Sequence, residues 1–132
     1  MKKATDSEKL FLDSSIWLAY FFGKSTEIRN TVDSEKSILF TSIISIHEIF
    51  KKIKTLQTEN DAEKALEFIE NNSIIIGLTK KTAIEAVNNC QKYSLHTIDS
   101  LVYTSAIQTK AVFVTADNDF RGTPKTRLVK MS

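Results

Sequence analysis

The stretch KLFLDSSIWLAYFF, residues 9–22, decides the fold. A short apolar run from Leu10 to Leu12 ends on Asp13, and two serines and a segment with helical character follow. This pattern predicts a buried strand that turns into a helix, with a carboxylate at the carboxyl end of the strand. Ligands of open parallel sheets bind at that end of the strands, so we expect the chemistry of the protein at Asp13.

The composition is that of one ordinary globular domain. The chain has 132 residues, of which 42% are hydrophobic and 26% charged, with only three Gly and one Pro. This is enough for a single core and argues against long flexible linkers. The single cysteine, Cys90, excludes an intrachain disulfide and suits a cytoplasmic location. No apolar run reaches the ~20 residues of a membrane helix, and no signal peptide is expected.

Short apolar runs alternate with helical patterns along the chain. We expect strands near residues 10–13, 38–40, 74–77, 111–115 and 127–131. Helices are expected from Ser14 or Ser15 to Gly23, and near 26–34, 42–54, 61–71, 79–91 and 98–109. The alternation predicts an α/β fold with a parallel sheet covered by helices on both faces. Residues 1–8 are expected to be a flexible extension of a single domain at 9–132.

Side-chain patterns add expectations about helix ends and faces. Ser14 or Ser15 is expected to cap the first helix, Asn60 with Glu63 the fourth, and Thr97 the sixth. Apolar stripes predict that the inward faces of the last two helices carry Ala83, Ile84, Val87 and Cys90 or Gln91 on the fifth helix, and Ile98, Leu101, Val102 and Ser105 on the sixth.

Four acids are expected on the carboxyl-end side of the sheet. Asp13 and Asp117 follow strands, Asp99 lies in the first turn of the helix before the fourth strand, and Glu48 lies near the start of the third helix. Each alone also fits a turn, a helix end or a solvated surface, so the hypothesis depends on their common side. Clustered carboxylates favour Mg²⁺ or Mn²⁺, which can activate water for phosphodiester hydrolysis. No CxxC, HExxH or glycine-rich phosphate loop is present.

Four segments carry a resemblance to a known family: FLDSS (11–15), TSIISIHEIFKKI (41–53), LHTIDSLVYTSAI (95–107) and FVTADNDF (113–120). In this order and spacing they resemble PIN-domain proteins, and most of all the VapC-type toxin ribonucleases. The resemblance implies a three-layer α/β/α sandwich around a five-stranded parallel sheet. It also implies an RNA substrate, a homodimer and a cognate antitoxin whose tail blocks the site.

The same resemblance implies roles for individual residues. It assigns Asp13, Glu48, Asp99 and Asp117 as metal-binding acids and Asp119 as a fifth, farther from the ion or helping a second one. Ser15 and Thr115 match polar residues that support these acids. The expected function is a metal-dependent endoribonuclease toxin. The alternatives are a catalytically silent RNA- or protein-binding module on the same fold and a phosphotransfer enzyme, whose D-x-D-x-T motif is missing at Asp13.

Several features keep more than one interpretation. The lysines after Glu48, at 51, 52 and 54, fit either an RNA backbone contact or a solvated helix face. The aromatic excess of the first helix, at 17 and 20–22, fits the core, a dimer surface or an antitoxin surface. The roles of His47, His96 and Arg121 stay open.

Overall fold

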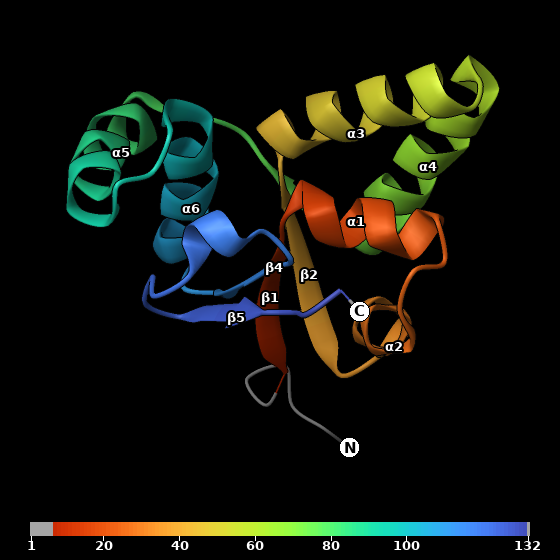
Figure 1. Cartoon of the computed structure of the whole chain (residues 1–132), viewed down its shortest axis with the longest axis horizontal. Coiled ribbons are helices and arrows are strands. Elements are labelled where there is room, and N and C mark those ends of the chain that lie inside the picture. The colour runs from red at the N-terminus through yellow and green to blue at the C-terminus, as the bar shows by residue number, and fades with distance from the viewer. Residues whose placement is uncertain (1–6, 132) are drawn as a thin grey trace.

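The computed structural model describes residues 7–131 and contains a five-stranded, wholly parallel sheet (Figure 1). Its strand order is β3-β2-β1-β4-β5. The strands are β1 (Glu8–Leu12), β2 (Ser37–Ser42), β3 (Ile74–Ile76), β4 (Val112–Thr115) and β5 (Thr126–Leu128). The expected parallel α/β architecture is confirmed.

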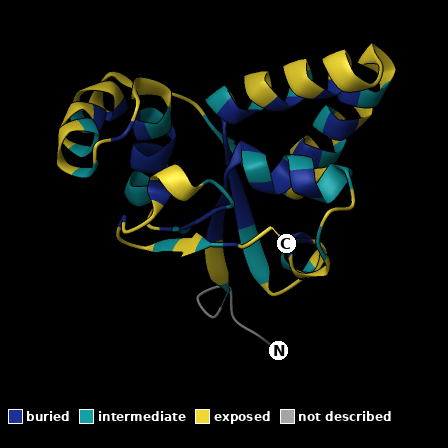
Figure 2. Ribbon diagram, viewed as in Figure 1, coloured by how far each residue is buried: buried dark blue, intermediate teal, exposed yellow. Residues whose placement is uncertain are grey.

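Six helices cover the two faces of this sheet. They are α1 (Ser14–Phe21), α2 (Thr26–Asp33), α3 (Ile43–Leu56), α4 (Glu59–Asn72), α5 (Lys80–Tyr93) and α6 (Thr97–Thr109). Alternating side chains of β1 enter two separate cores: Leu10 and Leu12 pack with α1 to α4, and Phe11 packs with α6. The central strands are accordingly buried between the helical layers (Figure 2), which gives the expected three-layer sandwich.

The order of the strands brings the segments after β1 and β4 together. From β1 the chain adds β2 and β3 on one side and then crosses back to place β4 on the other side of β1. β1 and β4 are paired, with Phe11 opposite Phe113 and Leu12 opposite Val114. The backbone N–H of Asp13 continues the ladder by donating to the carbonyl of Val114 at 2.9 Å. Their carboxyl ends therefore form the switch point where such sheets bind ligands.

Two helices begin without a side-chain cap, contrary to the sequence-based expectation. α1 starts at Ser14, so Asp13 occupies the cap position, and its side chain makes no capping hydrogen bond. Ser14 and Ser15 lie inside the first turn, which makes their expected capping role wrong. α6 likewise starts at Thr97, with His96 at the cap position and no side-chain bond. Both uncapped ends lie beside the candidate site described below.

The start of α4 differs from the prediction for a simpler reason. Thr58 Oγ1 accepts a hydrogen bond from the Asp61 N–H at 3.0 Å, so the helix begins at Glu59. The expected capping pair of Asn60 and Glu63 is wrong because a good cap residue stands two positions earlier.

The outer face of α5 and α6 also departs from expectation. Four apolar side chains predicted to face inward are exposed: Ala83, Ile84, Val87 and Ile98. The two helices meet through smaller and polar groups instead. Thr82 and Ala86 are buried, and the Thr82 hydroxyl donates to Gln108 Oε1 at 2.7 Å. The buried face of α5 is therefore not the face that carries its largest apolar side chains.

The sheet begins slightly earlier than expected. Glu8 pairs with Ser37 at the edge of β1, and its carboxylate accepts a hydrogen bond from Arg127 at 2.9 Å. The rest of the expected extension, residues 1–6, lies outside the described residues. No helix within residues 7–131 has both the length and the apolar character needed to cross a bilayer.

Candidate metal centre

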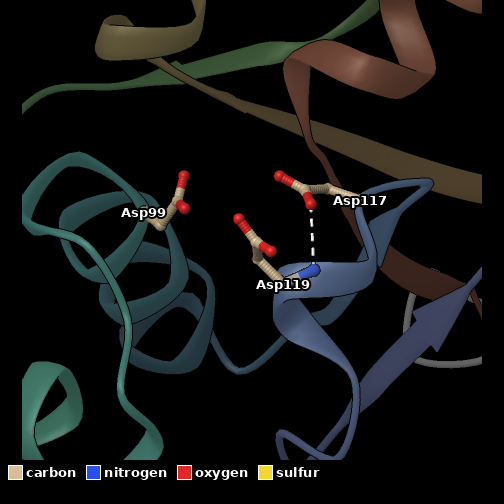
Figure 3. Close-up of side chains that lie close together, drawn as sticks. All are labelled: Asp99, Asp117 and Asp119. Carbon is tan, nitrogen blue, oxygen red and sulfur yellow. Dashed lines mark hydrogen bonds between the residues drawn. The ribbon is translucent and has the colours of Figure 1, made fainter.

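Three aspartates form the closest acidic cluster in residues 7–131. Carboxylate oxygens of Asp99, Asp117 and Asp119 all lie within 4.8 Å of one another. Figure 3 shows Asp99 projecting from α6 toward the other two, which lie on the turn after β4. The Asp117 carboxylate accepts a hydrogen bond from the Asp119 N–H at 2.9 Å, which caps the short 3₁₀ helix η2 (Asn118–Phe120). Asp117 thus fixes the turn that presents Asp119.

The core holds this turn in place. Phe120, directly after Asp119, is buried, and its ring centroid lies 4.8 Å from that of Phe113 on β4. Phe120 also packs beside Tyr103 of α6, whose hydroxyl donates to the Pro124 carbonyl at 2.7 Å. The aromatic contacts therefore connect the turn to the helix that carries Asp99.

Asp13 is the most buried acid of the site. Its Oδ2 accepts hydrogen bonds from Thr115 at 2.7 Å and Ser15 at 3.0 Å. Burial raises the pKa of Asp13 to about 6; these hydrogen bonds oppose the rise, and the charge of Glu48 adds to it. The Asp117 N–H donates to the Thr115 hydroxyl at 3.0 Å, so Asp13 is linked to the backbone of the aspartate cluster.

Glu48 reaches the site from α3, which lies on the face of the sheet opposite to α6. Its exposed side chain lies on α3, and Oε2 accepts a hydrogen bond from the Ser14 hydroxyl at 3.2 Å. The negative charge of Glu48 raises the pKa of both Asp13 and Asp99. Glu48 is therefore electrostatically part of one site with the acids after β1 and at the start of α6.

The site holds several negative charges without a neutralising partner. Burial raises the pKa of Asp99, followed in importance by the charges of Asp117, Asp119 and Glu48. Within the described part of the chain, the ion pairs join Lys54–Glu59, Lys81–Glu85 and Arg127–Glu8, and none includes a site acid. Such a set of carboxylate oxygens, without histidine or thiolate, fits a hard divalent cation such as Mg²⁺ or Mn²⁺.

The predicted residues converge, and Asp119 takes a central position among them. It was expected as a fifth acid, either farther from the ion or helping a second one, and its carboxylate belongs to the closest cluster. The D-x-D spacing of residues 117–119, with the first aspartate capping the turn, is the sequence signal that places the second aspartate beside the first. Sequence reasoning missed Ser14, whose hydroxyl bridges to Glu48 across the two segments.

The three residues whose roles were open lie around the site. His96 precedes α6, and its positive charge lowers the pKa of Asp99 against the larger raising effects. His47 is exposed beside Glu48 on α3. Arg121 donates to Asn118 Oδ1 at 3.4 Å, a contact within its own turn.

Comparison with solved structures places the fold among toxin–antitoxin proteins. A toxin–antitoxin complex from Klebsiella pneumoniae matches with a TM-score of 0.75 and 22% identity, covering 93% of this chain and 98% of that one. VapBC2 from Rickettsia felis, bound to a promoter DNA fragment, matches with a TM-score of 0.74 and 17% identity over 94% and 99% of the two chains.

A third solved structure has a stated activity. The sarcin–ricin loop cleaving toxin VapC20 from Mycobacterium tuberculosis matches with a TM-score of 0.71 and 13% identity, covering 87% of this chain and 95% of that one. At these identities the three structures establish a shared fold.

Comparison at the sequence level identifies the family. No curated protein sequence matches the chain significantly. The family model described as PIN domain matches residues 10–125. This range includes all five acids of the site, from Asp13 to Asp119. The chain therefore belongs to the PIN domain family.

Proposed function

We propose that the chain is a divalent-metal-dependent endoribonuclease and the cytoplasmic toxin of a toxin–antitoxin pair. The observation that carries this proposal is the group of carboxylates at the switch point, which no described cation neutralises. PIN family membership and the fold shared with a toxin that cleaves the sarcin–ricin loop support it.

The acids and the hydroxyl residues of the site have different proposed roles. Asp99, Asp117 and Asp119 would hold Mg²⁺ or Mn²⁺, with Asp13 and Glu48 completing the acidic site. When bound, such an ion supplies an activated water and stabilises negative charge on the phosphate. Ser15 and Thr115 act on Asp13 directly: their hydroxyls bind one carboxylate oxygen and leave the other for the site.

The test is cleavage of a mixed RNA pool by the purified chain in Mg²⁺, in Mn²⁺ and in EDTA. We expect cleavage with at least one ion, none in EDTA, and a loss of at least about 100-fold on Asp99→Asn. Asp61→Asn, which changes a partly exposed acid on α4 outside the site, is the matched control and should leave cleavage unchanged. RNA binding that EDTA does not affect, with no cleavage in either ion, would instead indicate a silent binding module.

A hollow beside the first helix suits the antitoxin. It has a volume of about 330 Å³ and lies between α1, α3 and α4, lined among others by Tyr20, Phe21, Ile53 and Phe68. The Tyr20 and Phe68 rings stack at 5.4 Å, and both side chains are partly exposed. We propose that an apolar segment of the antitoxin packs here, because similar folds occur in toxin–antitoxin complexes.

This partner has its own test. Phe68→Ala should weaken binding of the cognate antitoxin at least tenfold by calorimetry, because it removes one wall of the hollow. RNA cleavage by the free variant should persist. Unchanged affinity would place the antitoxin on a different surface.

A second exposed apolar surface suits a homodimer. Ile84, Val87 and Ile98 are 59%, 53% and 49% exposed on α5 and α6. We propose that a second copy of the chain covers this face, since three large apolar side chains in solvent are costly. Light scattering should show a dimer for the native chain and a monomer for Ile84→Glu; a native monomer at micromolar concentration would contradict this.

A further inference from the structure

The exposed face of α3 continues from the acidic site as a polar stripe. Glu48 and His47 occupy one turn, Lys51 and Lys52 the next, and Thr55 with Leu56 the turn after that. These six side chains line a hollow of about 440 Å³. All six are exposed. The stripe extends about 14 Å along the helix at 1.5 Å per residue.

The charges of this stripe lie in a particular order. Glu48 belongs to the site, through its bond to Ser14 and its effect on the pKa of Asp13. One helical turn farther, Lys51 and Lys52 form no ion pair with any residue between 7 and 131, and the nearby Lys54 pairs with Glu59 at 3.4 Å. Two uncompensated ammonium groups therefore border the acidic site without neutralising it.

This arrangement matches the needs of a polyanion at an acidic centre. The carboxylates repel a phosphate chain except where a cation is bound between them. An RNA strand would therefore need positive groups beside the acids, where they can bind the phosphates next to the reacting one. The 440 Å³ hollow provides space for such a strand beside the ammonium groups.

We propose that this stripe, His47 to Leu56, binds the phosphate backbone of the RNA strand that leaves the metal centre. Lys51 and Lys52 contact successive phosphates, His47 lies between them and the site, and Leu56 offers an apolar surface for a base at the far end. This inference rests on the proposed ribonuclease function and adds the direction in which the substrate crosses the protein.

The experiment compares two double variants with equal changes in charge. Lys51→Gln/Lys52→Gln removes the proposed contacts. Lys24→Gln/Lys36→Gln, which removes two exposed lysines in segments that flank α2, is the control. Binding of a fluorescent 20-nucleotide RNA of mixed sequence is measured in Mg²⁺ in an Asp99→Asn background between about 0.05 and 0.4 M salt. RNA cleavage is measured in the background with intact acids, and thermal unfolding checks that the variants are folded.

The expected result follows from counterion release. Each phosphate contact on a single strand contributes about 0.7 to the slope of log affinity against log salt, so the Lys51/Lys52 variant should lose about 1.4. At about 0.1 M salt this corresponds to roughly 20-fold weaker binding. In cleavage assays KM should rise with little change in kcat, and the control variant should behave like the native chain.

The outcomes separate this inference from the proposed function. If cleavage depends on metal but the two double variants have equal slopes of log affinity against log salt, the proposed role of the stripe is wrong and the ribonuclease function stands. Loss of antitoxin binding with unchanged RNA binding in the Lys51/Lys52 variant would assign the stripe to the protein partner instead, also against the inference. Absence of both RNA binding and RNA cleavage in the native chain would overturn both proposals.

Discussion

The Asp13→Asn substitution is expected to stabilise the metal-free protein. Burial raises the pKa of Asp13 from 3.8 to about 6 in the folded state. Between these values the folded chain holds a proton that the unfolded chain has lost. Stability of the native protein therefore falls as the pH rises from about 4 to about 6, and the full cost of the ionised group remains above that range.

The magnitude follows from the size of the shift. A change of about two pKa units at 1.36 kcal/mol per unit corresponds to about 3 kcal/mol of unfolding free energy. Asparagine is neutral and almost the same size. Its single carbonyl oxygen can still accept the hydrogen bonds of Ser15 and Thr115. The variant should therefore match the native protein near pH 4 and exceed its stability by up to about 3 kcal/mol at pH 8.

The assay is urea unfolding in EDTA at several pH values from 4 to 8. The difference between the native protein and Asp13→Asn isolates the residue, because the other carboxylates titrate in both. Asp61→Asn, at a partly exposed position on α4 outside the site, should show no comparable pH-dependent gain. An Asp13→Asn protein that is less stable than the native chain at pH 8 would refute the reasoning, as would a difference that does not change with pH.

Three other substitutions test separate parts of the structure. In thermal unfolding, saturating Mg²⁺ or Mn²⁺ should raise the native stability by about 3 kcal/mol at 100 times Kd, and Asp119→Asn should lose most of this gain; an equal gain would remove Asp119 from the site. Phe120→Ala should cost about 3–5 kcal/mol in urea unfolding and also weaken metal binding, because the buried ring anchors the turn of the aspartates. Trp17→Phe should cost about 1–3 kcal/mol by losing the 3.1 Å bond from its indole N–H to Thr41, whereas an unchanged midpoint would mean that this bond contributes nothing.

The aspartates after the strands could be predicted because their signals are local. An apolar run that ends on an acid marks the end of a buried strand, and this holds for both Asp13 and Asp117. β1 and β4 are paired, which is the arrangement that doubly wound sheets show at their switch point. The four acids that the family resemblance assigns to the metal are not equivalent in space, because Asp99 and Asp117 form the closest cluster with Asp119.

Long-range features were harder to predict. α5 carries two candidate inward faces, and the larger side chains, Ile84 and Val87, define the wrong one. The chain buries Thr82 and Ala86 instead, because a hydrogen bond to Gln108 satisfies the buried hydroxyl. Apolar periodicity cannot reveal such a choice, since it assigns the largest apolar residues to the interior whether another surface covers them or not.

The failed cap predictions carry functional information. Ser14 and Ser15 are good capping residues, yet their hydroxyls bind Glu48 and Asp13. The Asp13 side chain, at the cap position itself, makes no capping hydrogen bond and accepts instead from the hydroxyls of Ser15 and Thr115. A helix end whose polar side chains serve a buried carboxylate gives up a contribution of about 1 kcal/mol to its own stability. Local rules therefore fail at α1 because the same groups hold the acid that the proposed chemistry requires.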